Sequence, residues 1–267
     1  MFKSFYGLTF NPFDKSLPEN YAFLSHDHQQ MISRLDYLKN TRGIGLFTAP
    51  PGMGKTFSLR CFAKTLNPNL FQLSYICLST VSVSEFYHQF CFELGLDYNS
   101  KKSIMFRNIQ ERLLNFFKEK RKTFILAIDE SQYLNTGILR DIKMLMNVQF
   151  DSLDYFALVL IGQPYLGSIL EKPVHEALKQ RITVHYNYEG FSSDEGIDYI
   201  YSRIEAAGGA RSIIDEAAVR AAINFSQGTP RVINSVMTNA LILGTQLKQS
   251  TINTEVILSA SNNLSLL

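Results

Sequence analysis

The fold is decided by residues 46–56, which read Leu-Phe-Thr-Ala-Pro-Pro-Gly-Met-Gly-Lys-Thr. An apolar run is followed by a turn rich in glycine and proline, and Lys55 and Thr56 then open a helical pattern. Gly52 and Gly54 have no Cβ atom, so the backbone can bend until its N–H groups surround an anion. The free N–H groups at the start of the next helix favour the same negative charge. The stretch therefore predicts a phosphate-binding loop.

This loop predicts a set of ATP ligands, which are Pro51, Gly52, Met53, Gly54, Lys55, Thr56 and Phe57. Lys55 would reach the β- and γ-phosphates, and the Thr56 hydroxyl would ligate Mg²⁺. Ala49 stands where the usual pattern has glycine. If that position required a positive φ angle, alanine would be strained by about 1 kcal/mol.

A second motif follows the apolar run at residues 124–128. Asp129 and Glu130 come next, at the C-terminal end of a predicted strand, which is the edge where open α/β sheets bind ligands. Asp129 can hold Mg²⁺ directly or through water, and Glu130 can act as the general base on an attacking water. The chain between the two motifs has room for an extra strand, which indicates the additional-strand class of P-loop ATPases.

The bulk composition is that of an ordinary globular protein. The 267 residues are 46% hydrophobic and 19% charged, with a formal net charge of +2, so any basic surface for nucleic acid must be local. The three cysteines have no C-x-x-C spacing, which suits free buried thiols in a reducing cytoplasm. No apolar run approaches the ~20 residues of a membrane span, and the N-terminus lacks the order of a signal peptide. We expect a bacterial cytoplasmic protein with no membrane partner.

Strand and helix patterns alternate through the first two thirds of the chain. We predict strands at 43–48, 73–78, 124–128, 155–161 and 182–188, and helices at 27–40, 57–66, 83–94, 104–120, 138–148 and 174–180. This alternation implies right-handed crossovers and a parallel sheet with helices on both faces. The predicted fold class is α/β, an αβα sandwich with a five-stranded parallel sheet followed by a small all-helical domain.

Only helical patterns follow residue 188, at 193–207, 215–226, 230–247 and 254–262. Ser193 and Asp215 are the expected N-caps of the first two. We therefore predict a nucleotide-binding domain at 1–190 and a helical lid domain at 191–267, with a hinge near Gly190.

The N-terminal segment, residues 1–28, is rich in aromatic residues. Either it is a strap over the core, or Asn11, Pro12 and Phe13 lie beside the nucleotide base. His26 and His28 would be half of a metal site, but a solvated helix start is the favoured interpretation.

Three further polar residues are candidates, each with an ordinary alternative. Gln163 follows the fourth strand and could bond the γ-phosphate or the attacking water, although such amides are common after strands. Arg181 precedes the fifth strand and could be supplied in trans to a neighbour's phosphoryl group, or be a solvated helix-end cation. Arg231 follows Pro230 at a helix start and could reach the phosphates, or be a surface residue.

Together these motifs resemble those of AAA+ ATPases, and specifically of the ExeA-like group. The resemblance rests on Tyr6-Gly-Leu with Asn11-Pro12-Phe13, Gly54-Lys55-Thr56, Asp129-Glu130, Gly162-Gln163-Pro164, Leu178-Lys179-Gln180-Arg181-Ile182 and Gly228-Thr229-Pro230-Arg231. It implies that Gln163 is sensor 1, Arg181 the finger that acts on a neighbouring subunit, and Arg231 sensor 2. It also implies a homo-oligomer, as a ring or a helical filament. The departures are Ala49 and Lys179, where the family pattern has glycine and arginine.

ExeA-like proteins fall into two functional groups. One is a secretion-associated ATPase, usually longer, with a membrane span and a periplasmic peptidoglycan-binding part. The other resembles the TnsC, MuB and IstB transposition regulators, which assemble on duplex DNA with ATP and recruit or activate a transposase. Because the sequence shows neither extra segment, we expect an ATP-dependent transposition regulator, with a DDE-type transposase as partner and slow turnover outside the oligomer. The rival interpretations are a secretion-associated assembly ATPase, an ATP-gated scaffold with little turnover, and a replication initiator or loader. The last would need a sequence-reading DNA domain.

The resemblance also suggests a DNA-tracking surface after the second strand. Its candidate residues are Thr80, Lys101, Lys102 and Ser103. Such residues contact the DNA backbone and position a protein without reading sequence. A solvated loop with two lysines is the alternative.

Overall fold

The computed structural model describes residues 2–77, 81–148 and 153–265. The chain divides into two compact units. The helical unit comprises Met1–Gln29, Gly52–Gly54 and Glu189–Leu267, and the sheet unit comprises Gln30–Pro51 and Lys55–Tyr188. The parallel αβα fold predicted from the sequence is confirmed in the sheet unit.

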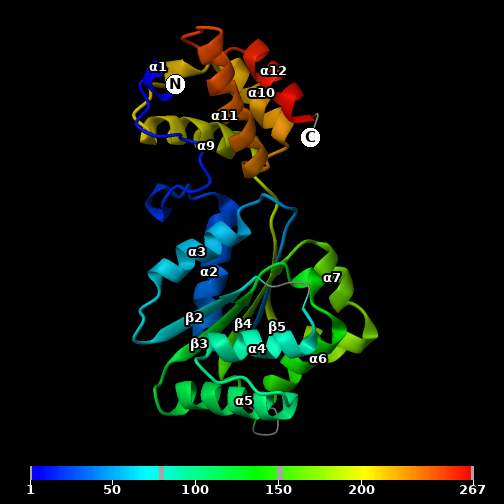
Figure 1. The fold of residues 1–267 in the computed structure, drawn as a ribbon. Coiled ribbons are helices and arrows are strands. Elements are labelled where there is room, and N and C mark those ends of the chain that lie inside the picture. Colours follow the sequence, from blue (N-terminus) through cyan, green and yellow to red (C-terminus); the bar gives the residue numbers. More distant parts are fainter. Residues whose placement is uncertain (1, 78–80, 149–152, 266–267) are drawn as a thin grey trace. The chain divides into compact units, whose positions relative to one another are not determined.

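The sheet has five parallel strands, in the order β2-β3-β4-β1-β5 (Figure 1). Their bounds are β1 (Gly43–Thr48), β2 (Phe71–Ile76), β3 (Thr123–Ile128), β4 (Phe156–Gly162) and β5 (Ile182–Asn187). The phosphate-binding loop follows β1, and the two acidic residues follow β3. Because β4 lies between these two strands, the predicted additional-strand arrangement is confirmed.

The three central strands explain the continuous apolar runs of the sequence. Every residue of β1, β3 and β4 is buried, as expected when helices cover both faces of a sheet. The edge strands β2 and β5 are only partly buried. We predicted β2 at 73–78, but it begins and ends two residues earlier. Its ladder stops where the backbone N–H of Asp129 donates to the Ile76 carbonyl at 2.8 Å.

Helices flank the sheet on both sides (Figure 1). They are α2 (His26–Thr41), α3 (Lys55–Thr65), α4 (Val83–Glu93), α5 (Lys102–Lys118), α6 (Thr136–Leu145), α7 (Tyr165–Leu170) and α8 (Glu176–Lys179), with short 3-10 turns η2 (Ser131–Tyr133) and η3 (Pro173–His175). The helix predicted at 174–180 is wrong in extent, since η3 and α8 divide it, and α7 was not predicted. The largest apolar cluster joins α4, α5 and α6 to the strand face that carries Leu46, Leu126 and Leu158.

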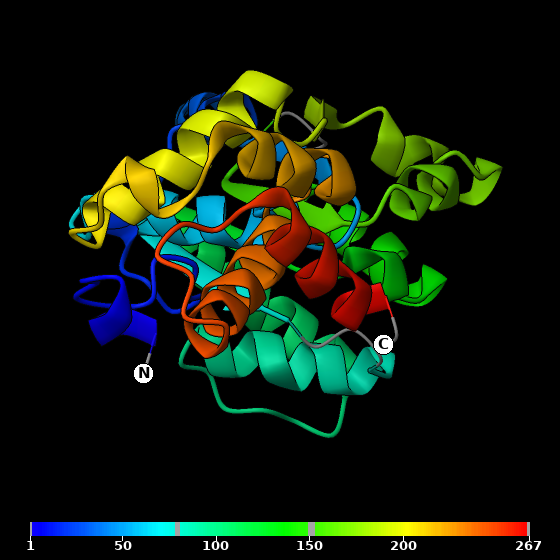
Figure 2. The same ribbon diagram turned by 90° about the horizontal axis from the view of Figure 1, so that it is seen from above.

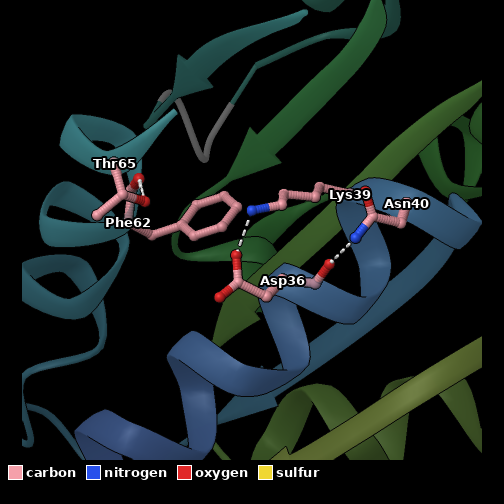
Figure 3. Close-up of polar contacts among 5 residues, drawn as sticks. All are labelled: Asp36, Lys39, Asn40, Phe62 and Thr65. Atoms are coloured by element: carbon pink, nitrogen blue, oxygen red, sulfur yellow. Dashed lines mark hydrogen bonds and ion pairs between the residues drawn. The ribbon is translucent and has the colours of Figure 1, made fainter. Parts of the chain in front are cut away.

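Lys39 ties α2 to the helix that follows the phosphate-binding loop (Figure 3). Its ammonium pairs with Asp36 and lies 5.8 Å from the ring centre of Phe62 on α3. The same ammonium lies 5.4 Å from the ring centre of Phe71 on β2. A cation over aromatic rings is attracted by their negative faces, most strongly when partly desolvated. The contact therefore helps to fix α3, whose first turn carries the loop lysine and threonine.

The helical unit contains the elements that follow β5, seen from above in Figure 2, where they are coloured yellow to red. They are α9 (Ser193–Ala206), η4 (Arg211–Ile213), α10 (Glu216–Ser226), α11 (Pro230–Gln246) and α12 (Thr254–Ser265). The N-cap predicted at Ser193 is wrong, because Ser192 caps α9 in a reciprocal capping box with Glu195. Asp215 caps α10 as predicted, accepting from the Ala218 N–H at 2.6 Å. Gly190 has a φ of +89° and donates its N–H to Asp27 at 2.8 Å.

The N-terminal segment, which includes α1 (Phe2–Phe5) and η1 (Glu19–Tyr21), packs into the helical unit. Tyr6, Leu8 and Phe13 belong to its hydrophobic core, and the Tyr6 hydroxyl donates to the Gln249 carbonyl at 3.0 Å. Phe13 is only 3% exposed. The segment is therefore a strap, and the core that it covers is that of the helical unit instead of the sheet unit. The Phe13 ring is enclosed in that core.

Candidate nucleotide-binding site

The two glycines of the phosphate-binding loop have the backbone that the sequence predicts. Gly52 has a φ of +89° and Gly54 a φ of +92°, in the region that residues with a Cβ rarely adopt. Ala49 is not among the residues with a positive φ. Its N–H donates to the Gly162 carbonyl at 3.1 Å, which extends the pairing of β1 with β4. Alanine in place of the usual glycine therefore causes no backbone strain.

The Lys55 side chain folds back onto the backbone of the loop. It is the first residue of α3 and is only 9% exposed. Its ammonium donates to the carbonyl of Ala49 at 2.8 Å and to that of Pro50 at 3.2 Å. Hydrogen bonds between an ammonium and an anion are stronger than those to a neutral carbonyl, so a phosphate in the loop would compete well for the same donor.

Thr56 and Asp129 meet at the C-terminal edge of the sheet. The Thr56 hydroxyl donates to Asp129 Oδ2 at 2.7 Å, and the Tyr75 hydroxyl at the end of β2 donates to the same oxygen at 2.9 Å. Asp129 is 5% exposed. Burial, followed by the negative charge of Asp129, raises the pKa of Tyr75 above its ordinary value. Tyr75 therefore remains a proton donor to the carboxylate. A hydroxyl and a carboxylate this close are the hard oxygen ligands that Mg²⁺ prefers.

Glu130 has an unusual backbone. Its φ of +51° places it in the left-handed region, which costs a residue with a Cβ about 1–2 kcal/mol. Its N–H donates to Asp129 Oδ1 at 2.9 Å. Its carboxylate accepts a hydrogen bond of 2.6 Å from the side chain of Gln132. Strained residues of this kind cluster at functional sites, where the surroundings hold them in place.

Strand register brings Gln163 to the same edge. Ile128 of β3 pairs with Leu160 of β4, so the residues that follow the two strands lie at one end of the sheet. The Gln163 N–H donates to the Gln132 side-chain oxygen at 3.0 Å. The predicted residues Lys55, Thr56, Asp129, Glu130 and Gln163 thus share one edge of the sheet unit. Sequence reasoning missed Tyr75 and Gln132.

Arg181 lies at the opposite edge. It directly precedes β5, and all five strands are parallel, so it stands at their N-terminal ends. A strand of six residues spans roughly 20 Å. Arg181 lines a polar hollow of about 440 Å³ with Lys143, Asp154, Ala177, Gln180 and Thr183. The structure therefore does not bring Arg181 to Asp129 and Glu130 of its own chain.

Within the helical unit, Arg231 contacts Gly52. The Arg231 N–H, in the first turn of α11, donates to the Gly52 carbonyl at 3.2 Å. A Cβ on Gly52 would lie 2.8 Å from Arg231 Cβ and 3.3 Å from the Thr229 methyl. Gly52 is therefore required both by its positive φ and by the close approach of α11.

Comparison with known proteins agrees with this geometry. A family model described as an AAA domain matches residues 38–170. Over 245 residues the chain is 31% identical to General secretion pathway protein A of Aeromonas hydrophila. The aligned region covers 91% of this chain and 44% of that protein. The chain thus spans less than half the length of this relative.

Several solved structures share the fold at low sequence identity. Cdc6p from Pyrobaculum aerophilum has a TM-score of 0.67 and 16% identity, over 90% of this chain and 67% of that one. The Aeropyrum pernix ORC1 protein, solved in complex with DNA, has a TM-score of 0.68 and 18% identity, over 93% of this chain and 68% of that one. The Thermotoga maritima RuvB Holliday junction branch migration motor has a TM-score of 0.61 and 18% identity, over 96% of this chain and 74% of that one. The chain therefore shares the fold of these structures.

The predicted DNA-tracking residues of this chain have different surroundings. Lys101 and Ser103 are exposed at the start of α5. Lys102 Nζ lies 2.6 Å from a carboxylate oxygen of Asp141 and 5.7 Å from the ring centre of Tyr87. The fold itself therefore partly neutralises the Lys102 charge. Thr80 lies outside the described residues.

The remaining expectations concern thiols, metals and membranes. Cys61 and Cys91 are buried as predicted, but Cys77 is exposed because the chain leaves β2 after Ile76. In the described ranges, no three His, Cys, Asp or Glu residues gather in a way that could hold a metal ion. No helix among the described residues has the length and apolar character needed to cross a membrane.

Proposed function

We propose that this AAA+ chain binds ATP with Mg²⁺ and hydrolyses the β–γ phosphate bond. The observation that carries the proposal is the 2.7 Å hydrogen bond between Thr56 and Asp129, residues of two distant motifs. The positive-φ glycines and Lys55 supply donors for the phosphates. Bound Mg²⁺, held by Thr56 and Asp129, would neutralise charge on the β- and γ-oxygens.

Glu130 is the proposed general base. It takes a proton from the attacking water, while Gln163 would bond the same water or the γ-phosphate. Arg181 stands at the far edge of the sheet, so it can serve only the site of another copy. Full turnover therefore requires a homo-oligomer in which the arginine of one subunit stabilises charge at its neighbour's phosphoryl group.

ATP turnover and nucleotide affinity test these roles. Lys55→Ala should lose nucleotide binding. Glu130→Gln should bind ATP normally but hydrolyse it roughly 10²- to 10⁴-fold more slowly, and so accumulate the ATP-bound assembly. Glu111→Gln makes the same exchange on the exposed face of α5 and is the matched control. If Glu130→Gln hydrolyses ATP at the normal rate, the base assignment is wrong.

The cellular role that we propose is regulation of DNA transposition. ATP-bound copies would assemble on duplex DNA through backbone contacts and recruit or activate a DDE-type transposase, and hydrolysis would dismantle the assembly. The motif set of the sequence and the exposed Lys101 and Ser103 support this role. The ORC1 protein, which has a similar fold, was solved in complex with DNA. This likeness supports a DNA partner for this chain.

A secretion-associated ATPase is the second candidate. It is favoured by the 31% identity with General secretion pathway protein A over 91% of this chain. This role predicts an envelope partner and an assembly that ignores DNA. A scaffold that binds ATP with little turnover is distinguished from both by the hydrolysis rate of the assembled form.

Sedimentation with and without ATP and duplex DNA, at two salt concentrations, separates the roles. Large assemblies that need both ligands and weaken with salt support the DNA role, because phosphate contacts release counterions. Lys101→Ala should then weaken assembly, while Lys248→Ala in the helical unit is the matched control. Assembly driven by ATP alone would remove the DNA role and favour secretion.

A further inference from the structure

Gln132 stands between the proposed general base and the end of β4. Its side-chain NH₂ group donates to Glu130 Oε2 at 2.6 Å, and its side-chain oxygen accepts from the Gln163 N–H at 3.0 Å. An amide has one acceptor end and one donor end. Because the Gln163 N–H must face the oxygen, the NH₂ group must face Glu130. The two contacts fix the orientation of the amide.

The space for this amide is built into the sheet. Gln132 is 7% exposed. A Cβ on Gly162, the last residue of β4, would lie 2.7 Å from the Gln132 side-chain oxygen and 3.4 Å from its backbone nitrogen. Gly162 is not among the glycines with a positive φ, so its backbone conformation does not require glycine. The absent side chain instead leaves room for Gln132 and for Leu166, whose Cδ2 would lie 3.0 Å from the added Cβ.

Glu130 depends on such support. Its backbone is left-handed, and its side chain is exposed, so the fold does not enclose the carboxylate by packing. The hydrogen bond from Gln132 holds one carboxylate oxygen and leaves Oε1 for a water. A general base must keep within hydrogen-bond reach of the proton that it removes, and small misplacements reduce the rate strongly.

We propose that Gln132 is the positioning residue of the general base and couples it to the loop after β4. The inference rests on the proposed role of Glu130 in ATP hydrolysis. When the backbone of Gln163 moves, the Gln132 amide moves with it, and so does the carboxylate of Glu130. Contacts made by Gln163 at the γ-phosphate would thereby be transmitted to the base.

Two variants of Gln132 separate positioning from simple bracing of the fold. Gln132→Glu keeps an acceptor for the Gln163 N–H but replaces the donor that faces Glu130 with an oxygen. Gln132→Leu removes both contacts at similar volume. We expect both variants to lower kcat roughly 10- to 100-fold, while the Kd for ATP stays within about twofold. A bracing role alone predicts normal turnover for Gln132→Glu.

Further variants keep the inference falsifiable if Gln132→Leu fails to fold. Gly162→Ala places a methyl against the Gln132 oxygen and should lower kcat without changing the Kd for ATP. Gln89→Leu on α4, whose amide contacts Glu93 at 3.4 Å, is the control for the chemical exchange. If Glu130→Gln is slow but Gln132→Glu and Gly162→Ala turn over normally, the inference is wrong. If Glu130→Gln itself turns over normally, the proposed function fails instead.

Discussion

The Thr56 hydroxyl and Asp129 Oδ2 lie 2.7 Å apart, although 73 positions separate the two residues in the chain. Thr56 lies in the first turn of α3, which follows β1, and Asp129 directly follows β3. Strand β4 lies between β1 and β3 in the sheet. Parallel strands direct all their C-terminal ends to one edge, so the hydroxyl of the predicted phosphate-binding loop and the carboxylate after β3 meet without any local sequence connection.

Replacing Thr56 by valine should weaken ATP binding only when Mg²⁺ is present. Valine has nearly the same shape but lacks the hydroxyl that would ligate the ion and that donates to Asp129. We expect the Kd for ATP to rise roughly tenfold or more with Mg²⁺ and to stay unchanged in EDTA, by titration calorimetry. Thr65→Val on the same helix removes a hydroxyl that donates to the Phe62 carbonyl within α3 at 2.7 Å (Figure 3), and should have no effect.

Tyr75→Phe should weaken the same Mg²⁺-dependent affinity by a smaller factor, because Asp129 loses one of two donors to the same oxygen. The raised pKa of Tyr75 keeps its hydroxyl protonated, so the difference from the unmodified protein should be constant between about pH 6 and 9. Combining Tyr75→Phe with Thr56→Val should give a non-additive effect, since neighbours that share a partner couple. Strict additivity would show that the two donors act independently.

Arg181→Ala should turn over slowly and be rescued by a partner with a different defect. The arginine stands at the opposite sheet edge from Glu130, so its proposed role in trans requires two copies for each complete site. In an equal mixture of Arg181→Ala and Glu130→Gln, about a quarter of the interfaces join an intact base to an intact arginine. Turnover should recover to about that fraction. Mixing Glu130→Gln with Lys55→Ala should not restore turnover, since no subunit then has both Lys55 and Glu130.

His175→Met should reduce acid sensitivity. His175 is 2% exposed, and neither ring nitrogen has a hydrogen-bond partner among the described residues. Burial lowers its pKa, and the positive charges of Lys172 and Arg140 lower it further. The unfolded chain therefore takes up the proton first, near pH 6.5, and stability present above that pH is lost as pH falls through the folded pKa. The free energy of unfolding, measured with urea at pH 7.5 and pH 5, should fall less in the variant; an identical fall would contradict the assignment.

The sequence predicted most of the sheet because burial on both faces produces continuous apolar runs. It placed β2 two residues late, since the apolar pattern continues through Cys77 after the ladder has ended at Ile76. The capping-box rule would have selected Ser192, which stands three residues before Glu195, in place of Ser193. The short helix α7 contains Gly167 and has only six residues, so periodicity had too little length to indicate it.

The candidate site was predicted only where a residue belongs to a motif. Tyr75 sits in an apolar run that predicts a strand, and nothing in that run indicates that its hydroxyl faces Asp129. Gln132 follows the acidic pair by two residues, but its contact with Gln163 depends on strand register. Long-range contacts of this kind arise from topology and are not visible in local pattern. The same limit applies to the N-terminal strap. Its aromatic-rich composition predicted that it packs on a core but did not specify which core.

The placement of the arginine and the acidic residues at opposite ends of the strands gives any open assembly of this chain a direction. At one terminus, Arg181 of the last subunit has no neighbouring nucleotide to contact. At the other terminus, the last subunit holds a nucleotide that no neighbour's Arg181 contacts. The second terminus would retain ATP longest, while every interior site hydrolyses at the full rate. Loss of subunits would then proceed unevenly along the polymer, and its lifetime would depend on length. A closed ring has no such terminus and would release its subunits without polarity.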